Sequence, residues 1–157
     1  MFQGPGREIH LPPLAGYGRF TIMRQRQGGE NTKDKPVRWI ASSREDLREF
    51  PDEAKRDVGF ALSYAQQGEK HPSAKPLKGF KGSGVLEVVE DYRGDTYRAV
   101  YTVRFARVVY VLHAFMKKSK TGIKTPRHEV KLIERRLKVA ENDYYNWLKE
   151  NTDEDAT

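Results

Sequence analysis

Three ionisable side chains stand out because they lie inside strands that are otherwise apolar. Residues 97–118, YRAVYTVRFARVVYVLHAFMKK, alternate as two β-strands do, yet they include Arg98 and His113 among Val, Leu and Tyr. If residues 105–106 form the hairpin tip, Arg98 pairs with His113, and Lys117 lies further along the same face. A cluster of cations of this kind attracts anionic groups such as phosphates.

Strict alternation assigns the remaining side chains of this hairpin to two faces. On the first strand, the set facing away from Arg98 is expected to pack against helices, and it consists of Tyr97, Ala99, Tyr101 and Val103. On the second strand, the set expected to share the face of His113 is Val109, Val111, Phe115 and Lys117. The opposite set, from Val108 to Met116, is also apolar, which predicts that this strand is central in its sheet.

The same residues also fit an interpretation without a site. Arg98 can neutralise Glu87 or Glu90 on the preceding strand, and His113 can be a buried neutral histidine bonded to the backbone. The lysine-rich segment 117–124 can be an ordinary solvated loop. The four histidines have no metal-ligand spacing, and the chain lacks a Gly-Lys-Ser phosphate loop, so no metal site is predicted.

The composition favours one globular domain with a polyanionic partner. The chain has 157 residues, of which 37% are hydrophobic and 32% charged, enough for a single core. A net charge of +7 and an isoelectric point of about 9.6 are typical of nucleic-acid-binding proteins, although other basic proteins share them. The absence of cysteine excludes disulfides and thiolate metal sites and suits a reducing cytoplasm. No segment resembles a membrane span or a signal peptide, so a cytoplasmic protein is expected.

The chain divides into three zones by composition. Residues 1–35 are rich in Gly, Pro and polar residues and predict a flexible N-terminal arm. Residues 36–151 predict the folded domain, and residues 152–157 an acidic tail. The FQGP sequence near the start and the internal Met23 leave open whether the arm is native.

The elements that must position the hairpin follow from apolar periodicity and from capping signals. A strand is expected at 37–43, and a first helix from Ser42 or Ser43, where Glu45 completes a capping-box spacing. A second helix holds Pro51 in its first turn and ends before Gly68. The remaining expected elements are a loop at 69–84, strands at 85–92, 96–104 and 107–116, and a last helix opened by Thr125 and Pro126. The fold class is therefore α+β: a small antiparallel sheet in the order β-α-α-β-β-β-α, with two N-terminal helices packed on it and a C-terminal helix.

Three motifs within residues 77–126 resemble a known family, and the resemblance covers about residues 37–140. They are the LKG sequence at 77–79, the Tyr-Arg-x-x-Tyr pattern at 97–101, and the Phe-x-Lys-Lys pattern at 115–118, which precedes Thr-Pro. In this order they resemble the phage-derived Gp49-like, HigB-type toxins of the RelE/ParE superfamily. The resemblance implies a RelE-like fold and a type II toxin that a cognate helix-turn-helix antitoxin protein neutralises.

Two activities are known among proteins of this kind, and the resemblance implies the first more strongly. Many members cleave messenger RNA in the ribosomal A site, which implies an endoribonuclease that inhibits translation. Others in the superfamily, the ParE-like proteins, inhibit DNA gyrase without cleaving RNA. The alternative is therefore a non-enzymatic binding toxin, or a phage protein that retains the fold without cleavage.

The resemblance assigns roles to several residues of this sequence. Arg98 matches the strand arginine that contacts the scissile phosphate in ribonuclease members, and Lys117 and Lys118 match the basic pair that ends the last strand. Lys78 matches a lysine of the loop that leads into the sheet. The other cations expected to bind RNA are Lys81, Arg104 and Lys120.

The implied reaction needs neither a metal nor a cofactor. RNA can be cleaved by its own 2′-hydroxyl, so the protein has only to align it, move protons and stabilise the phosphorane. We expect Arg98 and Lys117 to stabilise the developing charge, and His113 or Glu87 to transfer protons. The role of His113 comes from hairpin counting rather than from the family, and RelE itself has lysines where this chain has Glu87. The expected partners are the antitoxin, messenger RNA and the ribosome, with no membrane; the codon preference and the ribosome dependence stay open.

Overall fold

The computed structural model describes residues 34–118 and 124–152 of the chain. Three of the predictions fall outside these ranges: the N-terminal arm up to residue 33, Lys120, and the acidic tail beyond Thr152. The described residues form the α+β fold that the sequence predicts.

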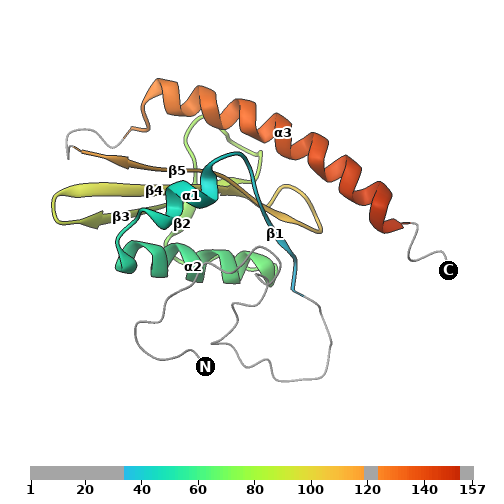
Figure 1. The fold of residues 1–157 in the computed structure, drawn as a ribbon, viewed down its shortest axis with the longest axis horizontal. Helices are drawn as coiled ribbons and strands as arrows, with labels where there is room; N and C mark the ends of the chain where they lie inside the picture. The colour runs from blue at the N-terminus through green and yellow to red at the C-terminus, as the bar shows by residue number, and fades with distance from the viewer. Residues whose placement is uncertain (1–33, 119–123, 153–157) are drawn as a thin grey trace, which may run out of the picture.

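The described residues form eight helices and strands, which follow one another along the chain (Figure 1). They are β1 (Val37–Trp39), α1 (Ser43–Arg48), α2 (Asp52–Gln66), β2 (Ala74–Pro76), β3 (Val85–Tyr92), β4 (Asp95–Thr102), β5 (Val109–Lys117) and α3 (Arg127–Thr152). The short strand β2 lies in a segment predicted to be a loop. Its Ala-Lys-Pro sequence carries no strand signal, and it pairs with β3 as an edge strand, where proline is tolerated.

The five strands form one mixed sheet in the order β1-β5-β4-β3-β2. Strands β2 to β5 pair antiparallel, but β1 runs parallel to β5, with Val37 opposite Val109. The prediction of a purely antiparallel sheet is therefore wrong for this one pair. The two helices between β1 and the other strands allow the chain to return in the same direction, as a parallel pair requires. Strand β5 has a neighbour on each side, as its two apolar faces predict.

Helices cover both faces of the sheet. Helix α2 packs on one face over a core that includes Leu47, Val58 and Tyr101. Helix α3 lies along the opposite face (Figure 1), over a second core that includes Tyr110 and Ile133. The sequence anticipated the first face as the core. The second face is also covered by a helix, so polar side chains that lie beneath this helix are buried instead of facing solvent.

Two polar contacts connect the C-terminal half of α3 to the sheet. The carboxylate of Asp143 accepts a hydrogen bond from the Tyr110 hydroxyl at 2.7 Å. The same carboxylate forms an ion pair with Arg38 of β1, with 2.7 Å between Nε and Oδ2. Burial and the carboxylate of Asp143 raise the pKa of Tyr110 above its usual value, so this hydroxyl keeps its proton and stays a donor.

The register of the β4–β5 hairpin differs from the predicted one. Arg98 pairs with Phe115, and His113 pairs with Val100, so the partners are shifted by two residues. A shift by two preserves the face, and Arg98 and His113 still lie on the same side of the sheet. The connection between β4 and β5 accounts for one residue of this shift, because Thr102 pairs with Tyr110 rather than with Val109, and a bulge in β5 adds the second residue.

A β-bulge at Leu112 also breaks the strict alternation expected for β5. Tyr101 pairs with Val111, whereas the preceding residue, Val100, pairs with His113, so Leu112 is an extra residue on its strand. Val111 therefore packs on the α2 side, while Leu112 and His113 both face α3. The prediction that Val109 and Val111 share the face of His113 is wrong for this reason. The bulge is what allows β5 to present a histidine beside an apolar side chain on the α3 side.

Candidate functional site

A buried ion pair between two strands forms the first part of the candidate site. Nη1 of Arg98 on β4 lies 3.1 Å from Oε2 of Glu87 on β3, and the two residues are only 4% and 7% exposed. The same nitrogen also donates to the Thr125 hydroxyl at 3.4 Å, just ahead of α3. Of the two partners that the sequence offered to Arg98, the structure brings Glu87 to it. Arg98 is therefore covered and neutralised in this conformation.

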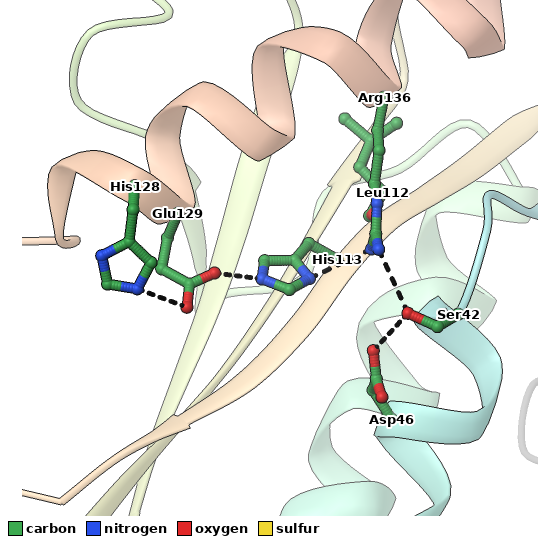
Figure 2. Close-up of polar contacts among 7 residues, drawn as sticks. All are labelled: Ser42, Asp46, Leu112, His113, His128, Glu129 and Arg136. Carbon is green, nitrogen blue, oxygen red and sulfur yellow. Dashed lines mark hydrogen bonds and ion pairs between the residues drawn. The ribbon is translucent and has the colours of Figure 1, made fainter.

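His113 forms the second part of the site and contacts two residues of α3 (Figure 2). Its Nε2 atom makes a short hydrogen bond to a carboxylate oxygen of Glu129. Its Nδ1 atom lies 3.1 Å from Nη1 of Arg136. The imidazole is 6% exposed and stacks on the ring of Phe115. The expectation of a buried histidine is met, but its partners are side chains rather than the backbone.

The contact with Arg136 determines the protonation state of the histidine. A guanidinium can only donate hydrogen bonds, so Nδ1 of His113 must accept one and carry no proton. The proton then lies on Nε2 and is donated to Glu129. Burial lowers the pKa of His113 and Arg136 lowers it further, whereas Glu129 acts in the opposite direction. The imidazole is thus neutral at pH 7; burial is the largest cause, and the cation beside the ring is Arg136 rather than Arg98.

Arg136 connects three elements of the fold through hydrogen bonds. Besides His113, it donates to the carbonyl oxygen of Leu112 at 2.9 Å and to the Ser42 hydroxyl at 3.1 Å. Ser42, which precedes α1, donates in turn to Asp46 at 2.7 Å. Figure 2 shows this chain running from α3 across β5 to α1. Ser42 therefore lies at the start of the first helix, as predicted, but bonds to Asp46 instead of capping the backbone.

The lysines predicted at the end of β5 lie at the rim of the same face. Lys117 is partly exposed, pairs across the sheet with Thr96, and donates to the carbonyl oxygen of Lys124 at 3.2 Å. Lys118 follows it and is exposed. Lys117 thus shares a face with Arg98 and His113, as the parity argument predicts. This rim is the part of the site that solvent reaches.

Three other predicted RNA-binding residues lie at the opposite end of the sheet. Lys78 and Lys81 are in the loop before β3, and Arg104 is in the loop after β4; all three are exposed. Gly84 brings the two loops together, because its backbone lies against that of Arg104. Six residues of β4 separate this end from the position opposite Lys117, a distance of about 20 Å. The predicted cations therefore form two groups rather than one.

Sequence reasoning missed Glu129 and Arg136, although a signal for both was present. Glu129 lies four residues before Ile133, and Arg136 lies three residues after it. Both are therefore on the buried side of α3, where charged side chains are uncommon unless they have partners. A charged residue within the apolar stripe of a helix indicates a polar partner on the opposing sheet. Here that partner is His113.

The described residues contain neither a cluster of metal-binding side chains nor a membrane-spanning helix. Between residues 34 and 118 and between 124 and 152, no three His, Asp or Glu side chains are grouped closely enough to bind a metal ion. Over the same ranges, none of the helices combines the length and the apolar character needed to cross a bilayer.

The fold and the site define a class of small basic α+β protein, in which one sheet face carries a buried arginine, a histidine and a rim of lysines. The chain belongs to the family described as phage derived protein Gp49-like (DUF891), whose model matches residues 45–138. This match confirms the family, that of phage-derived RelE- and HigB-like proteins, which the motifs indicated.

Other comparisons add little to this assignment. One solved structure, the toxin–antitoxin complex RelBE2 from Mycobacterium tuberculosis, is similar at 20% sequence identity over 55% of this chain and 94% of that one. The TM-score is 0.35, and a likeness at this level supports no argument about the present chain. No curated protein matches the chain.

Proposed function

We propose that this protein is the toxin of a type II toxin–antitoxin pair and that it acts as a metal-independent endoribonuclease on messenger RNA. The observation that carries the proposal is the location of Arg98, His113 and Lys117 on one sheet face, at the end where the lysine rim reaches solvent. Membership of the Gp49-like family and the net charge of +7 support it. The protein would act in the cytoplasm, on ribosome-bound messenger RNA, and a helix-turn-helix antitoxin would neutralise it.

The proposed chemistry uses the 2′-hydroxyl of the RNA as the nucleophile. This oxygen attacks the adjacent phosphorus and loses its proton, the phosphorane carries the extra negative charge, and the 5′-oxygen of the next nucleotide leaves with a proton. Lys117 and Arg98 would stabilise the phosphorane, since cations directed at developing charge contribute a few kcal/mol each. His113 would take or return a proton, with Glu87 as the other candidate.

The resting contacts impose a condition on this mechanism. The Nδ1 lone pair of His113 is occupied by Arg136, and the Glu87 carboxylate is occupied by Arg98. His113 cannot accept a proton at Nδ1 until Arg136 moves, and Glu87, which is 7% exposed, is not within reach of RNA in this arrangement. A phosphate is a strong bidentate partner for a guanidinium, so a substrate phosphate can compete for Arg136 or Arg98. The proposal therefore requires the side chain of Arg136 or Arg98 to change partner when RNA binds.

The test is a map of messenger RNA ends after brief induction in cells, with and without the protein. Cleavage should appear within translated sequences and should fall sharply when Lys117 and Lys118 are both replaced by glutamine. These two side chains are at the rim, so their loss should not affect folding. A matched control replaces two other exposed lysines by glutamine: Lys70, which follows α2, and Lys75, which is on β2.

Three results would count against the ribonuclease. One is growth arrest without new messenger RNA ends. Another is DNA breakage on induction, which would favour the gyrase inhibitor. The third is cleavage that the rim variant and the control variant affect equally, because the rim would then have no special role.

A further inference from the structure

The solvent-facing side of α3 carries a line of basic and polar residues. Positions three and four apart share one side of a helix with 3.6 residues per turn. The line, here called the α3 ridge, consists of Arg127, Lys131, Arg135, Lys138, Asn142, Tyr145 and Lys149. All seven residues are exposed. The ridge lies opposite the side through Ile133 and Ala140 that packs on the sheet.

The ridge does not simply reflect the overall charge of the helix. Residues 127–152 contain six Lys or Arg residues and five Asp or Glu residues, so α3 is almost neutral. The carboxylates lie elsewhere: Glu129 faces His113, Asp143 faces Arg38, and the others flank the ridge. Within the described parts of the chain, no carboxylate forms an ion pair with any of the five ridge cations. The positive charge of the ridge is therefore available to a partner.

The length and the chemistry of the ridge favour RNA over an acidic protein. From Arg127 to Lys149 the ridge extends for about 33 Å at 1.5 Å per residue. A helix of this length is a rigid support for a row of cations, and a phosphate backbone is a row of anions. Asn142 and Tyr145 add side-chain donors of the kind that bind phosphate oxygens. Tyr145, which is 59% exposed, is the only large apolar group in the ridge, whereas a stable protein interface needs a cluster of buried anchors.

We propose that the α3 ridge binds the phosphate backbone of RNA without reading its sequence. The inference rests on the proposed action on RNA, but it uses none of the side chains assigned to cleavage. Because Glu129 and Arg136 on the inner side of the same helix contact His113, the ridge would hold RNA on the outer side of an element that borders the proposed site. The ridge is thus a docking surface that is separate from the site of scission.

The test compares two variants with the same change in net charge. The ridge variant carries Lys131→Gln, Arg135→Gln and Lys138→Gln. The control variant carries Arg56→Gln, Lys70→Gln and Lys75→Gln, which replace exposed cations on α2, after it and on β2. Fluorescence anisotropy of a labelled RNA duplex of about 16 base pairs, long enough for a backbone-binding protein to contact two grooves, gives the affinity at several salt concentrations. Thermal melts check that both variants fold.

Each cation that contacts a phosphate contributes about 0.7 to 0.9 to the slope of log K against log salt. Loss of three such contacts should lower the magnitude of the slope by about two to three in the ridge variant. The control variant should keep a slope close to that of the unmodified protein. Equal effects in both variants would mean that only net charge matters, and no effect in the ridge variant would mean that the ridge does not touch RNA; either result overturns the inference.

The binding assay and the cleavage map can fail independently. If the unmodified protein cleaves messenger RNA and the ridge variant binds the duplex normally, the ridge inference is wrong and the proposed function stands. If no cleavage is found but the ridge variant loses binding with the expected slope, the ribonuclease is wrong and the ridge is a nucleic-acid surface of another kind.

Discussion

Replacing Arg98 by alanine tests whether its first role is to support the fold. The Arg98–Glu87 pair is almost completely buried, so the substitution leaves a carboxylate without its cation in a poorly hydrated environment. Removing one partner of a buried ion pair costs about 3–5 kcal/mol. For a domain of this size, 1 kcal/mol corresponds to about 4 °C in melting temperature. The expected loss is therefore about 12–20 °C at neutral pH.

A double replacement distinguishes the loss of the whole ion pair from the loss of one of its two members. Arg98→Met combined with Glu87→Leu keeps the volume and removes both charges, so its stability should lie within about 1 kcal/mol of the unmodified protein, or above it. Arg56→Ala, at an exposed position of α2, is the control and should change stability by less than about 0.5 kcal/mol. Differential scanning calorimetry and urea titration give both values. If Arg98→Ala alone costs less than about 1 kcal/mol, the buried pair is not structural, and the reasoning from burial is refuted.

Two further predictions concern a carboxylate and a glycine. Burial and the neighbouring Asp57 raise the pKa of Glu90 from 4.5 to about 7, so its ionisation destabilises the fold increasingly as pH rises between these values. Glu90→Gln should therefore raise the free energy of unfolding by about 1 kcal/mol at pH 8, after allowing for the partial exposure of this side chain, and should leave it unchanged at pH 4. Urea titrations at the two pH values measure this, and an equal gain at both would contradict the prediction. At Gly84, φ is +72° and an added Cβ would lie 3.0 Å from the backbone nitrogen of Arg104. Gly84→Ala should lower the free energy of unfolding by about 2 kcal/mol or more. The control is Gly82→Ala, at φ +75° with open space around it, which should lower it by only about 1 kcal/mol. Equal losses would exclude the close approach to Arg104 as the cause.

Local signals predicted the elements well, because each signal acts within a few residues. Strand β3 has the predicted bounds, and α2 ends before Gly68 as predicted, whereas Pro51 is the N-cap of α2 rather than a residue of its first turn. The amphipathic stripe of α3 is correct, with Ile133 and Ala140 fully buried. What the stripe did not reveal is which sheet face it covers, because both faces of the central strand are apolar.

The errors come from interactions between residues distant in sequence. The bulge at Leu112 reflects how β5 fits against β4, and nothing in an apolar run indicates where an extra residue is accommodated. The prediction that Arg98 and His113 share one face is nevertheless correct, because the predicted register of the two residues was wrong by two positions, and a shift by two preserves the face. The closure of that face by Glu129 and Arg136 depends on how a helix about 20 residues away packs on it, so the sequence predicted the cluster but not its burial.

The parallel pairing of β1 with β5 has a consequence for how the chain folds during its synthesis. Trp39 pairs with Val111, about 70 positions further along the chain, so the edge of the sheet cannot close until most of the domain has been made. At about 5–20 residues per second, a ribosome needs roughly 4 to 14 s to add that length. Over this interval α1 and α2 have no β5 to pack on, and their apolar sides depend on incomplete contacts or on chaperones. The nascent chain is therefore most vulnerable to proteolysis and aggregation just before β5 leaves the ribosome. A substitution that weakens β1 should reduce the yield of folded protein in cells even where it changes the free energy of unfolding of the purified protein only slightly.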